Sequence, residues 1–236
     1  MPKIYIVKAG QIMELSDKVY GPFDKSKVII EPVVHKNNYS SSPIKYLYND
    51  EKLDLLFMLP TSSCYGINPI YPFGTREGVL QGYQFCYTIK DEYFRRCLCE
   101  LNKVVFDYIN YTSDRLPDST INAFTSALTD NKRAVDYVVK PCYGKDDKMY
   151  IKLNTFGNGQ NVRVNTVLYS DLHRISVNAF LDRPCEITPL ISCKHVYWGS
   201  HGSNSHGASV KFKLEQAVLK EKQKALSEDT ILDILE

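Results

Sequence analysis

The chain has 236 residues, of which 44% are hydrophobic, and a formal net charge of +2. A chain of this length and composition can bury a substantial core, which argues against an intrinsically disordered protein. The longest uninterrupted apolar run, Leu55–Leu59, is too short to cross a bilayer, and the Met1-Pro2-Lys3 start lacks the apolar segment of a signal peptide. We therefore expect a soluble, intracellular protein without membrane contact.

The near-neutral total hides an uneven distribution of charge along the chain. Residues 1–131 hold 14 Lys/Arg against 15 Asp/Glu, residues 132–224 hold 15 against 8, and residues 225–236 hold none against 4. A basic segment followed by an acidic end is typical of a surface that binds a polyanion. Ordinary solvated charge is the alternative interpretation.

In the first part of the chain, short hydrophobic runs alternate with turn-forming segments. Residues 3–7 and 53–59 have the composition of buried strands, with a polar loop at 37–43 between them. Residues 60–82 are rich in turn formers and aromatic side chains, which predicts an ordered, irregular loop. Residues 83–89 then alternate apolar and polar side chains, as a half-buried strand does.

Two helices are predicted next. Asp91 can cap a helix at 92–110. An apolar stripe on this helix, expected to pack on the barrel, consists of Phe94, Leu98, Leu101, Val105 and Tyr108. A second helical pattern covers 118–129 and fades in a charged stretch.

After Pro141 the pattern changes to β structure. Five strands are predicted, at 149–155, 162–169, 174–180, 192–198 and 208–219. The Gly157-Asn158-Gly159 segment predicts a turn that tolerates positive φ, and the small polar residues 199–207 predict a mobile loop. Five strands at this spacing suit a small barrel.

Motifs of common enzymes are missing from the sequence. The chain has no P-loop, no His-Glu-x-x-His and no nucleophile elbow, so we expect no enzyme and no cofactor. The best metal candidates are Cys193, His195, His201 and His206. Cys193 and His195 are expected on one face of a strand, but the spacing to the other two matches no common zinc site, so we expect no metal.

Cations and aromatic rings share the predicted outer surface of the C-terminal strands. Candidate phosphate contacts are Lys152, Arg163, Arg174, Lys211 and Lys213, and candidate stacking platforms are Tyr150, Tyr169, Tyr197 and Trp198. This combination suits single-stranded nucleic acid, because cations neutralise phosphates while rings stack on any base. The alternative is that any strand with one wet face alternates in this way, and that Trp198 is a buried core residue.

Three segments resemble a known family. Residues 207–219 resemble the last barrel strand of the phage T-seven type single-stranded-DNA-binding proteins, and residues 82–89 with the following helix, and 187–198, match earlier blocks in the same order. Single-stranded-DNA-binding proteins of nucleocytoplasmic large DNA viruses look similar in the same region. The resemblance covers about residues 55–220 and implies an OB-fold that coats unwound DNA during replication, recombination or repair of a phage or virus.

Together these features predict an α+β, mainly β protein: an OB-like antiparallel β-barrel with one or two packed helices and an N-terminal extension. The predicted division is an extension at 1–50, the single-strand-binding domain at 51–220 and a short acidic tail at 221–236. Because the acids and aliphatics of Ser227–Glu236 alternate, this segment could dock on replication proteins or on a second copy of the chain. The resemblance would place the protein in the host cytoplasm or a viral replication compartment.

Two other functions stay open at this point. The β-domain could be the scaffold of a protein-interaction or virion structural module that binds no nucleic acid. The histidines between His195 and His206 could belong to a metal-dependent nuclease. The sequence also leaves the preference between DNA and RNA open.

Overall fold

The computed structural model describes residues 3–7, 19–21, 23–36, 39–71, 78–111, 140–141, 147–157, 159–200 and 206–222. The strands are β1 (Lys3–Val7), β2 (Val19–Gly21), β3 (Val28–Ile30), β4 (Val34–Lys36), β5 (Tyr39–Tyr48), β6 (Glu51–Met58), β7 (Ser62–Cys64), β8 (Asn68–Ile70), β9 (Gly82–Thr88), β10 (Lys140–Pro141), β11 (Asp147–Leu153), β12 (Thr155–Phe156), β13 (Arg163–Val164), β14 (Val167–Ser170), β15 (His173–Ile175), β16 (Cys185–Ser200) and β17 (His206–Glu221). One α-helix, α1 (Glu92–Tyr111), and the 3-10 turns η2 (Lys25–Lys27), η5 (Gly159–Asn161) and η6 (Val177–Phe180) complete the described part. The predicted helix at 118–129 and the tail segment Ser227–Glu236 lie outside it.

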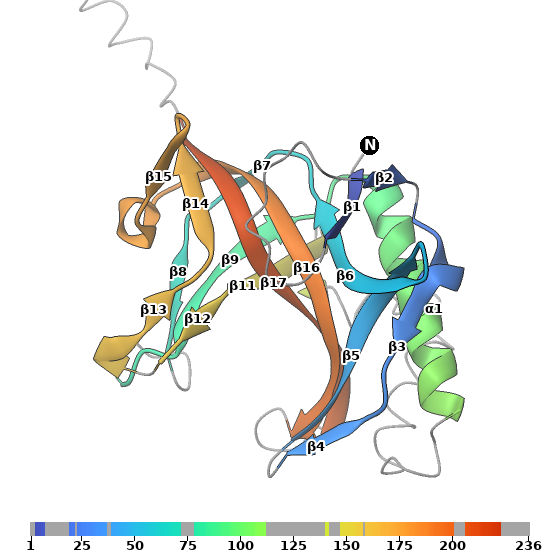
Figure 1. Cartoon of the computed structure of the whole chain (residues 1–236). Helices are drawn as coiled ribbons and strands as arrows, with labels where there is room; N and C mark the ends of the chain where they lie inside the picture. The colour runs from blue at the N-terminus through green and yellow to red at the C-terminus, as the bar shows by residue number, and fades with distance from the viewer. Residues whose placement is uncertain are drawn as a thin grey trace, which may run out of the picture.

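One large sheet, in the order β2-β1-β6-β5-β16-β17-β11-β9-β8, forms most of the molecule (Figure 1). The two longest strands, β16 and β17, pair along their whole length as an antiparallel hairpin. The other edge of β17 pairs in parallel with both β11 and β14, so the sheet is mixed rather than antiparallel throughout. At its far end β16 also pairs with β7, which lies against β9 and curls the sheet around its core. The prediction of an α+β, mainly β protein is confirmed.

Helix α1 covers one part of the core. The Asp91 carboxylate accepts a hydrogen bond from the Phe94 N–H at 2.6 Å, which is the predicted N-cap. Along the helix, the predicted stripe members Phe94, Leu98, Leu101 and Val105 are all fully buried and belong to the main hydrophobic core. The capping residue and the apolar spacing thus set both the start of the helix and the face that packs on the sheet. None of the helices in the described ranges is long and apolar enough to span a bilayer.

Several predicted boundaries differ from the structure. The predicted loop at 37–43 is wrong from Tyr39 onward, because β5 begins there and pairs with β16. Its serines suggested a loop, yet Ser42 is buried within the sheet and its hydroxyl lies 3.2 Å from the Tyr108 hydroxyl. Within the predicted irregular loop at 60–82, β7 and β8 are regular strands.

Two predicted strands in the second half are interrupted or end early, and one hairpin is longer than expected. The strand predicted at 162–169 is divided into β13 and β14. The strand predicted at 174–180 stops at Ile175, because the Ser176 hydroxyl accepts a hydrogen bond from the Asn178 N–H and caps the 3-10 turn η6. The loop predicted at 199–207 is shorter, since Gly199 and Ser200 still pair with Gly207 and His206.

The division of the chain at residues 50 and 220 stays a prediction. In the structure, β1 and β5 belong to the same sheet as the strands after residue 50.

Candidate nucleic-acid interface

The candidate interface is the surface of β11, β17 and β16 that faces away from the core. Side chains on these strands alternate as predicted, with Ile151 and Leu153 of β11 and Phe212 and Leu214 of β17 buried. The outward side chains come from three hydrogen-bonded neighbouring strands and therefore share one surface. We call this surface the basic face; it consists of Tyr150, Lys152, Lys194, His195, Tyr197, Lys211 and Lys213.

Two lysines lie directly opposite each other at the centre of the basic face. Lys152 of β11 and Lys213 of β17 are register partners in the parallel pair. Like charges placed opposite each other destabilise a sheet. Neither lysine has an acidic ion-pair partner among the described residues that would offset this repulsion. Burial lowers the pKa of Lys213, and the charges of Lys152 and Lys194 lower it further against the opposing effect of Glu215. An anion between these two lysines would relieve the repulsion.

A bulge in β16 adds a cation that the sequence pattern did not reveal. The register shifts between Cys193 and His195, so Lys194 is the extra residue. Its ammonium lies 2.8 Å from Glu215 and 3.3 Å from Asp54, and Asp54 also binds Lys45 at 2.7 Å. Burial acts against the charged form of Lys194, but Glu215 and Asp54 outweigh it and raise its pKa. Neither Asp54 nor Glu215 forms an ion pair with Lys152 or Lys213 in the described structure.

The same bulge separates two of the residues considered as candidate metal ligands. Cys193 and His195 were expected on one face, but Cys193 is buried in the core while His195 is exposed. The expectation fails because the bulged Lys194 reverses the alternation between them. No group of three potential metal ligands occurs among the residues that the structure describes. His201 lies outside them, as does the side chain of His206.

Beside the central lysines, Lys211 and Tyr197 form a cation–π contact. The Lys211 ammonium lies 5.1 Å from the centre of the Tyr197 ring, on neighbouring strands. Tyr150 is half exposed on β11. The structure thus brings five of the nine predicted residues, Tyr150, Lys152, Tyr197, Lys211 and Lys213, to one surface. Trp198 follows on β16, with its side chain outside the described part.

The remaining predicted residues lie on the neighbouring strands β13 to β15. Tyr169 and Arg174 are register partners on β14 and β15, and Arg174 is exposed. Arg163 lies on the β12–β13 hairpin, where its guanidinium carbon is 5.9 Å from the centre of the Phe156 ring. Phe156 is 49% exposed, and the sequence analysis missed it because it directly precedes the Gly157 turn rather than lying within a long strand.

The β12–β13 hairpin is fixed at its base to β17. The Thr166 hydroxyl donates to the Leu214 carbonyl at 2.7 Å and accepts from the Asn154 N–H at 2.8 Å. The Asn154 amide also donates to Glu215 at 2.8 Å. These bonds break the predicted strand at Thr166, because the hydroxyl takes the place of a ladder partner. They also hold the hairpin beside the basic face.

Comparisons with known proteins give a likeness at the level of structure alone. A scan against protein-family models finds no match, and a search of curated proteins finds none. Among the solved structures that match is gp2.5, a single-stranded DNA-binding protein encoded by bacteriophage T7. The alignment is 16% identical and covers 78% of this chain and 96% of that chain, with a TM-score of 0.32. At this level we take no functional argument from the likeness, and the functional proposal rests on the surface itself.

Proposed function

We propose that the protein binds single-stranded DNA without strong sequence preference, along the basic face. The observation that carries the proposal is the pairing of Lys152 with Lys213, two like charges opposite each other without an ion-pair partner in the described structure. A phosphate backbone supplies the missing negative charge. Exposed aromatic rings on the same surface offer stacking partners that do not discriminate between bases.

The elements and side chains of the basic face favour a single strand over a duplex. A helix that enters the major groove is the usual means of reading duplex DNA, and the one α-helix among the described residues, α1, packs its apolar stripe on the core instead. Tyr150 and Tyr197 instead present rings on the strands themselves, where unpaired bases can reach them. Arg163 and Arg174 would extend the phosphate path toward β13 and β15.

Several parts of the proposal rest on the sequence resemblance. They are a role in replication, recombination or repair of a phage or virus, a location in host cytoplasm or a viral replication compartment, and contact with replication proteins through Ser227–Glu236. Self-association rests instead on the alternating acids and aliphatics of Ser227–Glu236. We also propose that the protein is not an enzyme and that Trp198 stacks on a base.

The test is fluorescence anisotropy of a labelled, unstructured oligonucleotide, single-stranded and duplex, over a series of salt concentrations. We expect tighter binding to the single strand and a log–log salt slope of about −0.7 for each phosphate contacted. Five contacts would give a slope of about −3.5, and affinity would fall on the order of 100-fold between 50 and 200 mM salt. Absence of binding at low salt would refute the proposal and return attention to a protein-interaction module.

A further inference from the structure

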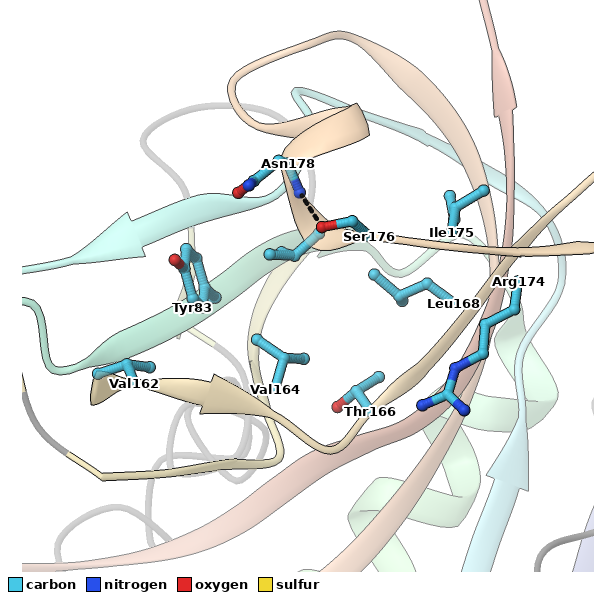
Figure 2. Close-up of a pocket in the computed structure, with 10 residues that line it drawn as sticks. Tyr83, Val162, Val164, Thr166, Leu168, Arg174, Ile175, Ser176 and Asn178 are labelled. Carbon is cyan, nitrogen blue, oxygen red and sulfur yellow. Dashed lines mark hydrogen bonds between the residues drawn. The ribbon is translucent and has the colours of Figure 1, made fainter. Parts of the chain in front are cut away.

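A pocket of about 380 Å³ opens between β9, β13, β14, β15 and η6 (Figure 2). Half of the residues that line it are aliphatic, namely Val162, Val164, Leu168, Ile175 and Val177. Three of these side chains, Val164, Ile175 and Val177, are only partly buried, although they pack against the main core. The pocket has a volume typical of small-ligand sites.

Polar groups at the pocket are of two kinds. The hydroxyls of Thr166 and Ser176 already have backbone partners that hold the walls in place. By contrast, the Tyr83 hydroxyl, the Arg174 guanidinium and the Asn178 amide make no hydrogen bond or ion pair to other described residues. Three different elements contribute these groups, and Figure 2 shows Arg174 to the right of the pocket with Tyr83 to the left.

This combination suits one class of ligand. A nucleobase has flat apolar faces, which aliphatic walls can cover, and a rim of donors and acceptors, which a phenol and an amide can meet. Arg174 adds a cation for the phosphate attached to the same nucleoside. The pocket borders β17, because the Thr166 hydroxyl in its wall donates to the Leu214 carbonyl.

We propose that this pocket receives one base of a bound single strand, which leaves the backbone path at Arg174. The inference rests on the proposed function, since a strand must first lie on the basic face. It differs from surface stacking in that the base enters a pocket and its edge is hydrogen-bonded. The pocket then fixes the position of the strand, whereas the lysines only attract it.

The experiment compares a thymidine oligonucleotide with one of equal length made of abasic nucleotides, which has the same phosphates and no bases. Val164→Phe fills the pocket and should weaken binding of the thymidine oligonucleotide about tenfold, the typical worth of one stacked base. Binding of the abasic oligonucleotide should not change. Val218→Phe is the matched control, because Val218 is exposed on β17 and is not part of the pocket.

The outcomes separate this inference from the proposed function. Equal binding of the thymidine oligonucleotide by Val164→Phe, Val218→Phe and the unaltered protein would overturn the pocket while leaving strand binding intact. Failure of the unaltered protein to bind either oligonucleotide would overturn both. Competition by free thymidine monophosphate at the pocket, with oligonucleotide affinity unchanged by Val164→Phe, would assign the pocket to a free nucleotide and overturn the strand-base proposal.

A second variant tests the same pocket in case Val164→Phe does not fold. Asn178→Ala removes one of the edge-binding groups from an exposed position, while its backbone N–H still bonds to Ser176. We expect a loss of about threefold for the thymidine oligonucleotide and none for the abasic one. Equal losses for both oligonucleotides would show that the residue does not meet a base.

Discussion

Replacing Lys152 and Lys213 together by glutamine should weaken DNA binding and, at the same time, stabilise the free protein. Glutamine keeps much of each aliphatic stem and removes the charge. Each phosphate contact on a single strand contributes a salt slope of about −0.7, so the double variant should show a slope less steep by about 1.4. At 0.1 M salt that corresponds to about 1 kcal/mol for each contact, or a loss of affinity of roughly 20-fold for both.

The stability effect has the opposite sign because the two lysines repel each other across neighbouring strands. Relief of a like-charge cross-strand pair is worth about 0.2–1 kcal/mol. In a protein of this size that raises the Tm by about 1–3 °C. Low salt should enlarge the increase, since screening already weakens the repulsion at high salt.

The assay is fluorescence anisotropy at five salt concentrations, with thermal unfolding followed by circular dichroism in the same buffers. Lys103→Gln serves as the matched control, since Lys103 on α1 pairs with Glu100 at 2.8 Å, away from the basic face. If Lys103→Gln changed the slope as much as the double variant did, net charge rather than the basic face would govern binding. An unchanged slope in the double variant would refute the assignment of both lysines to phosphates.

Three further predictions concern the framework of the site. Thr166→Val should lower the free energy of unfolding by about 1–3 kcal/mol, because the Asn154 N–H and the Leu214 carbonyl lose their partner. Urea denaturation measures this loss. Thr166→Ser keeps the hydroxyl and should lower the free energy of unfolding by less. Burial raises the pKa of Asp54, but hydrogen bonds and attraction from its lysine partners outweigh burial and lower it. The stability due to Asp54 is therefore present above about pH 4 and lost as the pH falls through the lowered pKa, so Asp54→Asn should be less stable at pH 7 and show a flatter acid profile in a pH series of thermal melts. A thiol oxidant such as diamide should form a disulfide between Cys64 and Cys185, because their sulfurs lie 3.4 Å apart on paired strands. Mass spectrometry without reductant should find the linked peptide. A linked peptide that contains Cys193 instead would contradict this pairing.

The parts of the fold that follow from local chemistry were predictable from the sequence. The start of α1 and its buried face follow from Asp91 and from apolar residues at helical spacing. The inward and outward faces of β11 and β17 follow from strict alternation in 149–153 and 210–214. These signals depend only on neighbours within a few residues, and tertiary contacts reinforce them.

The predictions that were wrong concern residues whose partners lie far away in the chain. Ser42 looked like a loop residue because its hydroxyl partner, Tyr108, is 66 residues away. The break at Thr166 depends on the Leu214 carbonyl, 48 residues away. The bulge at Lys194 leaves no mark in the sequence pattern, yet it moves His195 away from Cys193 and adds Lys194 to the candidate site.

The candidate site itself was only partly accessible to sequence reasoning. Alternation identified the outward cations of single strands, but it gave no information on which cations face each other. The opposition of Lys152 and Lys213 comes from a parallel pairing between strands separated by more than fifty residues. The pocket that contains Tyr83 and Asn178 likewise requires β9 and η6 to meet, which no local pattern predicts.

The shared edge of β17 has a consequence for how this protein can change over evolution. The strands β11 and β14 occupy successive stretches of one edge, and the chain between them leaves the sheet as the β12–β13 hairpin and returns at Thr166. Insertions or deletions within that hairpin would shift neither of the flanking registers, since each is fixed by its own pairing. Changes in the length or the residues of the Phe156–Arg163 segment would therefore alter the side chains beside the basic face, while the strands of the sheet keep the same register.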